Sequence, residues 1–157
     1  MTRSESKRFS KALAFAAEKH AEQRRKDKSP YILHPVKVAM FLSDNGYDLR
    51  YQIVGLFHDL LEDTDTTTDE LRDFCDEEMI EAIQLVTKSA DYNEKEYIEA
   101  ILNNPIAKAV KNADRIDNLR DLKNQEDIEF RKRYLHDTEQ YFVGKFSEEL
   151  DRIWSGS

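Results

Sequence analysis

A group of titratable side chains occupies the stretch LFHDLLEDTD (residues 56–65), which otherwise has the apolar character of a buried helix. Its members are His58, Asp59, Glu62, Asp63 and Asp65. Unpaired charges in such a setting cost several kcal/mol, or they are neutralised by a shift of their pKa. On a continuous helix, His58 and Glu62 share one face, and Asp59 and Asp63 share the adjacent face. Two interpretations follow: the cluster binds a cation, or it is an ion-paired helix end that faces water.

Two further positions bear on this choice. His34 directly precedes Pro35, where a helix is expected to begin, so it is either a ligand or a helix cap. Asp114 follows Ala113 on an apolar stripe in AVKNADRIDNL. An inward carboxylate there needs a partner, whereas an outward one forms a surface salt bridge.

Taken together, four of these residues provide two imidazoles and two carboxylates: His34, His58, Asp59 and Asp114. A mixed set of nitrogen and oxygen donors suits a hard to borderline divalent metal and leaves positions open for water and substrate. Glu62 and Asp63 lie one turn further along, and we expect them to position or deprotonate an attacking water.

Long helices must carry these residues, because only four glycines and three prolines interrupt the chain. Apolar spacing and capping patterns predict helices over about residues 3–24, 35–46, 49–62, 68–74, 76–87, 94–104 and 105–122. A last helix carries apolar residues from Ile128 to Ile153. The stripe around Tyr134 and Leu135 is interpreted as core, and His20 and His136 as structural or solvated. We therefore predict an all-α fold of about eight helices in a single domain over residues 1–157, with its core at about residues 3–153.

Composition limits the class of function. The 157 residues carry a net charge of −8, which argues against a general nucleic-acid binder. The single cysteine, Cys75, excludes an internal disulfide, and neither a signal peptide nor a membrane span is recognisable. We expect a cytoplasmic protein with no nucleic-acid or membrane partner; the oligomeric state is left open. The local basic cluster RRKDK (residues 24–28) is compatible with a small anionic ligand.

The same residues resemble a known family. His34, the HD pair at 58–59 and Asp114 match the metal pattern of HD-domain phosphohydrolases. The longer segments RRKDKSPYILHP, GLFHDLLEDTDTT, LVTKS and KNADRIDNLRDL resemble the hydrolase domain of the RelA/SpoT group and its small stand-alone members. The resemblance runs from about His20 to the YLHDTEQYF segment, and it implies a helical HD-domain bundle. It also implies hydrolysis of the 3′-pyrophosphate of guanosine tetra- and pentaphosphate.

The resemblance further implies a role for individual residues. His34, His58, Asp59 and Asp114 would bind one manganese ion, and Glu62 and Asp63 would serve the attacking water. The substrate-binding positions would be Arg25, Lys26, Lys88 and Asn118. Taken alone, Arg25 and Lys26 equally suit a helix C-terminus, Lys88 a solvated helix end, and Asn118 a polar helix shoulder.

Three positions depart from the family pattern. Asp27 stands where a small residue is usual, Asp117 where many relatives carry His or Tyr, and Asp121 where long members often have a hydroxyl residue. These departures concern the choice of nucleotide and leave the metal pattern intact. Hydrolysis of another nucleotide, such as a nucleoside phosphate or the 2′-phosphate of NADPH, therefore stands as the alternative activity. A non-catalytic nucleotide-binding module and a helical adaptor are the alternatives outside enzymes.

Overall fold

The computed structural model describes residues 1–122, 128–142 and 152, and every regular element in these residues is a helix. The helices are α1 (Arg3–Lys19), α2 (Leu33–Asp44), α3 (Leu49–Phe57), α4 (Leu60–Asp63), α5 (Thr68–Leu71), α6 (Glu77–Val86), α7 (Glu94–Leu102), α8 (Pro105–Leu122) and α9 (Ile128–Phe142). In the described ranges the only bridge is an isolated antiparallel pair, Arg24 with Pro30. The prediction of an all-α fold is confirmed.

Local side-chain bonds start most of these helices where the sequence predicts. Thr2 with Glu5 and Thr67 with Glu70 form complete capping boxes at α1 and α5. The side chains of Asp48, Asp76 and Asn93 accept backbone N–H groups at the starts of α3, α6 and α7. These contacts span two or three residues, so the sequence alone specifies them.

Several predicted boundaries are wrong. The first helix ends at Lys19 rather than near residue 24, so Arg25 and Lys26 lie in a loop instead of at a helix C-terminus. The second helix begins at Leu33, which places His34 and Pro35 inside its first turn. The fourth predicted helix is shorter than expected, ending at Leu71 rather than near residue 74.

The predicted helix over residues 49–62 is interrupted. α3 ends at Phe57, His58 and Asp59 form a turn, and α4 is a single turn that starts at Leu60. The helix on which His58 and Glu62 were expected to share a face is therefore not continuous. His58 is buried and Asp59 largely so, whereas Glu62 and Asp63 are exposed.

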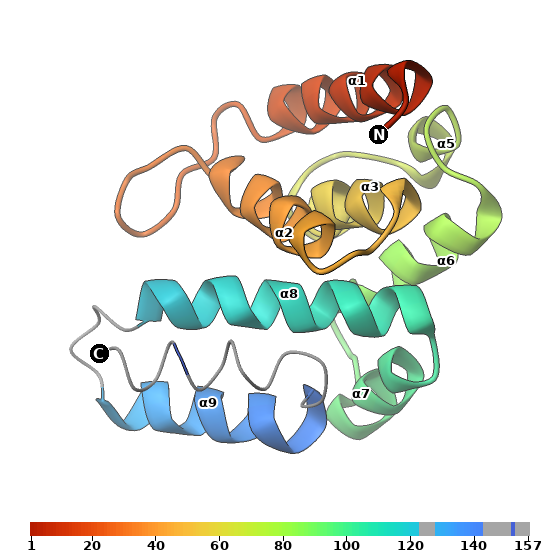
Figure 1. Cartoon of the computed structure of the whole chain (residues 1–157). Coiled ribbons are helices and arrows are strands. Elements are labelled where there is room, and N and C mark those ends of the chain that lie inside the picture. The colour runs from red at the N-terminus through yellow and green to blue at the C-terminus, as the bar shows by residue number, and fades with distance from the viewer. Residues whose placement is uncertain (123–127, 143–151, 153–157) are drawn as a thin grey trace.

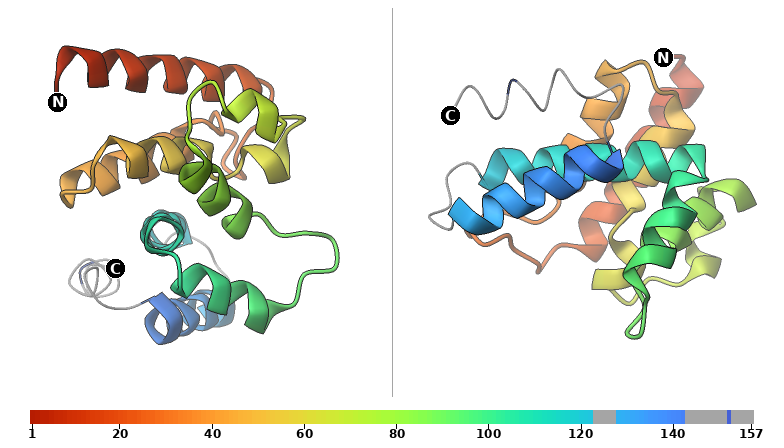
Figure 2. Two further views of the ribbon diagram at one scale, coloured as in Figure 1. Left: turned by 90° about the vertical axis from the view of Figure 1, so that its right-hand side faces the viewer. Right: turned by 90° about the horizontal axis from the view of Figure 1, so that it is seen from below.

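From top to bottom the helices follow in the order α1, then α2 and α3, then α8, then α9 (Figure 1). α3 contacts α1, α2 and α8, so it lies at the centre of the fold. A view turned by 90° shows the same order, with α6 beside α8 and α7 beside α9 (Figure 2). The core includes Phe57, Leu42, Ile53 and Leu56, whose side chains are fully buried. This arrangement brings the start of α2, the end of α3 and the middle of α8 together.

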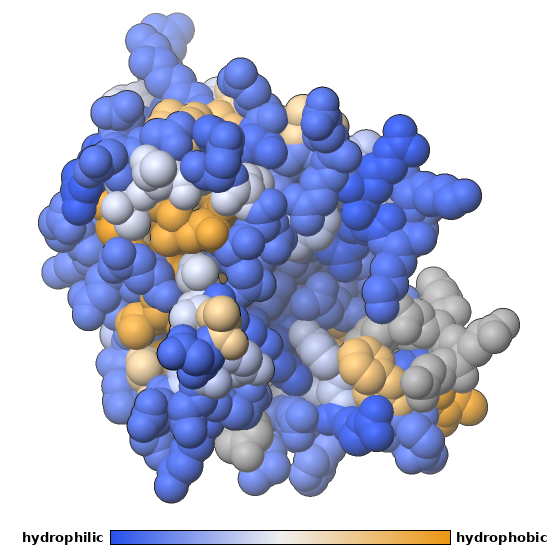
Figure 3. All heavy atoms as spheres, turned by 180° about the vertical axis from the view of Figure 1, so that it is seen from behind, coloured by the Kyte–Doolittle hydropathy of each residue, from blue (hydrophilic) through white to orange (hydrophobic). Residues whose placement is uncertain are grey.

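The face opposite to that of Figure 1 is mostly hydrophilic, with apolar side chains in small separate groups (Figure 3). Of the helices described here, none has the length and apolar character needed to cross a bilayer. In α9, Leu135 is buried and Tyr134 is half-buried against the core, as expected. Phe146, Leu150 and Ile153, which were assigned to the same helix, fall outside the described residues. The single domain over residues 1–157 stays a prediction.

Candidate metal centre and active site

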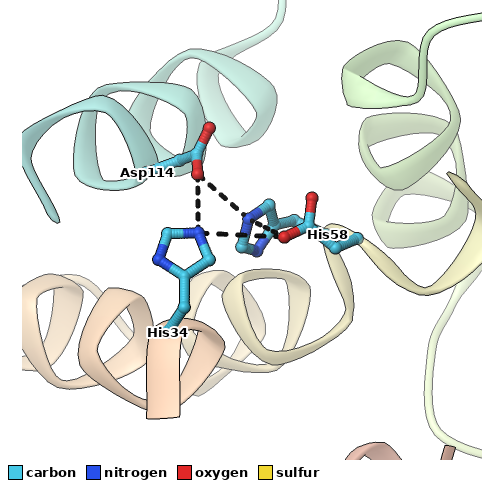
Figure 4. A group of neighbouring side chains, drawn as sticks. His34, His58 and Asp114 are labelled. Atoms are coloured by element: carbon cyan, nitrogen blue, oxygen red, sulfur yellow. Dashed lines mark hydrogen bonds and ion pairs between the residues drawn. The ribbon is translucent and has the colours of Figure 1, made fainter. Parts of the chain in front are cut away.

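Four side chains converge on one point inside the fold. His34, His58, Asp59 and Asp114 each offer one ligand atom, and these atoms all lie within 4.8 Å of one another. The two imidazoles and the Asp114 carboxylate point toward a common centre (Figure 4). Oδ1 of Asp114 lies 2.8 Å from Nε2 of His34 and 3.3 Å from Nε2 of His58. The sequence predicted this set, and the structure brings all four together.

The four ligands come from three parts of the core. His34 lies in the first turn of α2, His58 caps the end of α3, and Asp114 lies in the middle of α8. The turn between α3 and α4 redirects the chain, so that Oδ2 of Asp59 lies 3.0 Å from Nε2 of the adjacent His58. On an unbroken helix, neighbouring side chains would diverge by about 100°. The two consecutive residues of the turn between α3 and α4, His58 and Asp59, both contribute to one centre.

The opposite nitrogen of each imidazole has a fixed partner. Nδ1 of His58 lies 2.6 Å from the carbonyl oxygen of Gly55, and Nδ1 of His34 lies 2.7 Å from Oδ2 of Asp117. A carbonyl oxygen only accepts, so Nδ1 of His58 carries a proton. This arrangement orients both rings with Nε2 toward the centre, as in histidines that bind metals.

Each of the two carboxylates also accepts a hydrogen bond from another side chain. The Tyr31 hydroxyl donates to Oδ2 of Asp59, and the Lys111 ammonium donates to Oδ2 of Asp114 at 3.2 Å. Burial is the main cause that raises the pKa of Tyr31, so this phenol keeps its proton. Lys111 is itself well buried, with 15% of its side chain exposed, so the structure pairs it with Asp114 rather than with water.

Contacts among these side chains raise the pKa values of the two histidines and lower those of the two aspartates. Burial opposes the charge on His58, but the Asp59 charge and the hydrogen bond with Asp114 raise the His58 pKa well above its usual value. The pKa of His34 is also raised, because hydrogen bonds with Asp114 and Asp117 outweigh its burial. Burial alone would raise the pKa of Asp59, yet the neighbouring His58 lowers it to about 2. The pKa of Asp114 is held well below its ordinary range, because the charge of Lys111 and the His34 hydrogen bond overcome its burial.

The balance of charge among these side chains shows whether the site fits a cation. The Lys111 ammonium compensates part of the charge of Asp114, and on the side of the centre the two carboxylates face only the imidazoles of His34 and His58. A divalent ion would replace the protons on these imidazoles and take one lone pair from each of four side chains. The donor types, the common focus and the oriented rings all agree with such an ion.

The two carboxylates assigned to the attacking water follow the Asp59 ligand within four residues of the chain. Glu62 and Asp63 are exposed on α4, directly after the Asp59 turn. Oε1 of Glu62 accepts the backbone N–H of Lys88 at 2.7 Å, and Oδ2 of Asp63 accepts from the Gln23 amide at 3.3 Å. Neither carboxylate is among the four converging atoms, so both remain open to solvent and to a ligand.

Two of the predicted substrate-binding residues, Arg25 and Asn118, are linked to the centre by hydrogen bonds. Arg25 forms an ion pair with Asp121, and its Nη2 lies 3.3 Å from Oδ1 of Asn118. Asn118 in turn donates to Oδ1 of Asp114 at 3.3 Å, which links the Arg25 loop to the metal ligands.

Lys26 and Lys88 are exposed, and Nζ of Lys88 lies 5.2 Å from the ring of Tyr92 and 5.5 Å from the ring of Tyr97. Asp27 also faces solvent, and its carboxylate accepts the backbone N–H and the hydroxyl of Ser29.

The sequence analysis did not identify three residues that hydrogen-bond to the ligands: Tyr31, Lys111 and Asp117. Lys111 lies three residues before its partner Asp114, and this spacing on a helix is the signal that could have found it. Tyr31 bonds to Asp59 across 28 positions, so no local pattern indicates that contact. Asp117 was noted only as a departure from relatives. Its contact with His34 joins residues 83 positions apart, so no local pattern could reveal it.

Comparisons with known proteins agree with this geometry. A family model described as HD domain matches residues 12–104. The guanosine-3′,5′-bis(diphosphate) 3′-pyrophosphohydrolase of Aquifex aeolicus (strain VF5) is 38% identical over 120 residues, which cover 71% of this chain but 17% of that protein. The chain thus spans a small part of the long bacterial relatives.

Shorter relatives match over most of their length. The guanosine-3′,5′-bis(diphosphate) 3′-pyrophosphohydrolase MESH1 of Xenopus tropicalis is 41% identical over 71% of this chain and 68% of its own. The human MESH1 is 39% identical over 76% of this chain and 72% of its own. A solved structure of a metazoan ortholog of SpoT that hydrolyses ppGpp superposes with a TM-score of 0.78 at 27% identity, covering 95% of this chain and 94% of that one. On the strength of the family match, this chain belongs to the HD domain family.

Proposed function

We propose that this chain hydrolyses the 3′-pyrophosphate of guanosine tetra- or pentaphosphate, releasing pyrophosphate and leaving GDP or GTP. The support comes from relatives of similar size. The MESH1 proteins of Xenopus tropicalis and Homo sapiens are named as 3′-pyrophosphohydrolases of this nucleotide, and the chain spans about two thirds or more of each. The similar solved structure is described as hydrolysing ppGpp.

The convergence of four ligand atoms, followed along the chain by Glu62 and Asp63, is the observation that carries the proposal. A structural metal site needs only its ligands, and it is usually closed. Two solvent-exposed carboxylates directly after a ligand turn are instead suited to handling a water. The site therefore favours hydrolysis over a silent nucleotide-binding module.

Each residue has a role in this proposal. His34, His58, Asp59 and Asp114 hold one divalent metal, which we propose is manganese because the resemblance to the RelA/SpoT hydrolase group implies it. The mixed imidazole nitrogens and carboxylate oxygens suit a hard to borderline divalent ion. When bound, the metal supplies Lewis acidity toward the phosphoryl oxygens and lowers the pKa of water.

Glu62 and Asp63 orient the attacking water and accept its proton. Arg25, Lys26 and Lys88 neutralise charge that develops on the phosphate oxygens, and Asn118 helps to hold the nucleotide. The products leave without any covalent intermediate on the protein. We further propose that the enzyme works in the cytoplasm, since its single cysteine is a buried free thiol.

Phosphorus NMR of the purified protein with guanosine tetraphosphate tests the proposal directly. We expect pyrophosphate and GDP signals to appear with added manganese and to be absent with a chelator. A panel with a nucleoside triphosphate and NADPH separates the proposed substrate from other nucleotides. Turnover of these compounds without turnover of guanosine tetraphosphate would overturn the substrate assignment.

Three variants separate the roles. Asp114→Ala removes a ligand, so it should lose both metal binding and turnover. Asp63→Asn should lose turnover by about a hundredfold or more while it still binds metal. Asp65→Asn is the matched control, because that carboxylate is 90% exposed and pairs with Lys19. Wild-type turnover by Asp63→Asn would refute the role given to Asp63.

A further inference from the structure

A histidine outside the metal centre has an unexplained buried atom. His20 directly follows α1 and is 2% exposed, and its ring packs against Tyr31 with a centroid distance of 4.9 Å. Nδ1 lies 2.8 Å from Oε1 of Gln23, but Nε2 is buried and has no hydrogen-bond partner among the described residues. A buried polar atom without a partner is energetically unfavourable, so its presence needs a physical reason.

The reason lies in the neighbouring amide. Gln23 bridges His20 and Asp63, with Oε1 toward the ring and Nε2 donating to Oδ2 of Asp63 at 3.3 Å. The reverse orientation would place the amide oxygen against a carboxylate, which repels it. Oε1 therefore faces the imidazole and needs a donor there, so the His20 proton must be on Nδ1. Nε2 is then left as a lone pair without a partner.

The backbone also fixes the position of Gln23. Its N–H donates to the carbonyl of His20 at 2.9 Å, and its own carbonyl accepts the N–H of Tyr31 at 2.9 Å. The next residue, Arg24, forms the isolated antiparallel bridge with Pro30. A side chain that starts from such a constrained loop presents its amide at a fixed place. Asp63, at the exposed end of the single-turn α4, receives its hydrogen bond from this amide.

We propose that Gln23 is a positioning residue that aims the Asp63 carboxylate, and that His20 fixes the direction of the Gln23 amide. The inference rests on the proposed function, in which Asp63 orients the attacking water. Gln23 and His20 touch neither the four converging ligand atoms nor the reacting atoms. Their effect is on geometry, and a misplacement of a catalytic group by about 1 Å costs on the order of a hundredfold in rate.

The variant Gln23→Glu tests the amide. Glutamate has the same size and still accepts from His20, but it presents an oxygen to Asp63 in place of a donor. We expect kcat to fall by about tenfold to a hundredfold, with KM and manganese affinity within about twofold of wild type. Gln84→Glu, at an exposed position on α6, is the matched control for the added charge. An unchanged kcat in Gln23→Glu would overturn the proposal.

A pair of variants tests the imidazole. In His20→Asn the amide nitrogen stands near the place of Nδ1 and keeps the donor, whereas His20→Leu removes it. We expect the asparagine variant to retain kcat within about threefold and the leucine variant to lose about tenfold or more. Thermal unfolding of both variants accounts for any loss of folded protein. Equal kcat values for the two variants at equal stability would show that His20 only fills space.

An NMR measurement decides the arrangement without any activity. Nitrogen-15 spectra should show the His20 proton on Nδ1, and the Gln23 side-chain amide signals should move in Asp63→Ala while those of Gln84 do not. A proton on Nε2, or Gln23 signals that ignore the loss of Asp63, would overturn the proposal. A wild-type protein that shows the His20 proton on Nδ1 and the Gln23 response to Asp63→Ala, yet does not hydrolyse guanosine tetraphosphate, separates the two proposals. That result would overturn the proposed function but would support the hydrogen bond between Gln23 and Asp63.

Discussion

The two carboxylate oxygens of Asp114 contact different partners. Oδ1 faces the imidazoles of His34 and His58, and Oδ2 faces the ammonium of Lys111. With Oδ2 already engaged, Oδ1 is the oxygen available to a metal. One side chain thereby connects a buried cation of the protein with the ligand set, and its negative charge is balanced on both sides.

Metal affinity should fall as the pH is lowered. The pKa values of His34 and His58 are both raised above 6.5 in the folded protein, so both rings take up protons before they would in a free peptide. Metal must displace these protons, and each costs about tenfold in affinity per pH unit below its pKa. Titrating manganese by calorimetry between pH 6 and 8.5 should show this loss beginning above about pH 6.5.

The stability of the metal-free protein should change with pH in the opposite direction: it should increase as the pH is lowered. A raised histidine pKa contributes stability that is fully present below about pH 6.5 and is lost as the pH rises through the folded value. Chemical denaturation of chelated protein should therefore show it more stable at pH 6.5 than at pH 8.5. Higher stability at pH 8.5, or an affinity for manganese that does not change with pH, would mean that His34 and His58 are not charged in the metal-free protein.

Asp117 should tune the metal site through His34. Its carboxylate accepts from Nδ1 of His34 at 2.7 Å and is buried, so it both orients the ring and makes Nε2 a stronger donor. Asp117→Asn keeps an acceptor oxygen but removes the charge, and we expect manganese affinity to fall about tenfold. Asp121→Asn is the control, because that carboxylate lies one turn further on α8 and pairs with Arg25 instead. Equal affinities for the two variants would contradict the role of Asp117.

At the scale of helices, what the sequence predicts depends on how far apart the interacting residues lie. The caps at Thr2, Asp48 and Asp76 are correct because each contacts a backbone N–H within three residues. The break after Phe57 was missed because LFHDLLED is compatible with a helix. Its turn is accompanied by contacts from distant elements, such as the Tyr31 hydroxyl on Asp59 across 28 positions.

Gly55 governs the spacing between the helices that carry His34 and His58. A Cβ at this position would lie 3.0 Å from Cδ1 of Leu42 and 3.2 Å from Cγ1 of Val38, both on α2. We expect Gly55→Ala to lower the free energy of unfolding by about 1–2 kcal/mol, since overpacking outweighs the better helix propensity of alanine. Chemical denaturation measures this loss. Manganese affinity should fall as well, because α2 is pushed away from α3.

Gly46→Ala provides the contrast. Gly46 has a φ of +82° at the end of α2, and no atom would lie within 4 Å of a new Cβ. Alanine is strained in this conformation, so we expect a loss of about 1 kcal/mol in stability but an unchanged affinity for manganese. A Gly55→Ala protein that binds manganese as tightly as Gly46→Ala would show that the α2–α3 spacing does not control the site.

At the scale of the whole molecule, the all-α fold and the four ligands could be predicted because they depend on composition, periodicity and a few residue types. The partners that hold the ligands could not, because they depend on how helices far apart in sequence pack. The ion pair between Arg25 and Asp121 shows this: the loop after α1 meets the end of α8 across 96 positions. No pattern within either segment indicates the other.

The metal should act as a cross-link for the entire core. Its proposed ligands lie on α2, at the α3–α4 turn and on α8, so one ion connects segments that span residues 34–114. An ion that binds only the folded state stabilises it by about 2.7 kcal/mol at a free concentration of 100 times Kd. We therefore expect manganese to raise Tm by several degrees over chelated protein, with the increment growing with manganese concentration.

Two variants test where the ion binds. His58→Ala should lose this increment in Tm, because one ligand of the centre is gone. Asp69→Asn should keep it, because that carboxylate is 89% exposed and pairs with Arg72. A Tm that is the same with manganese and with chelator would mean that the four side chains hold no ion in the folded protein, and equal increments in both variants would place the ion elsewhere.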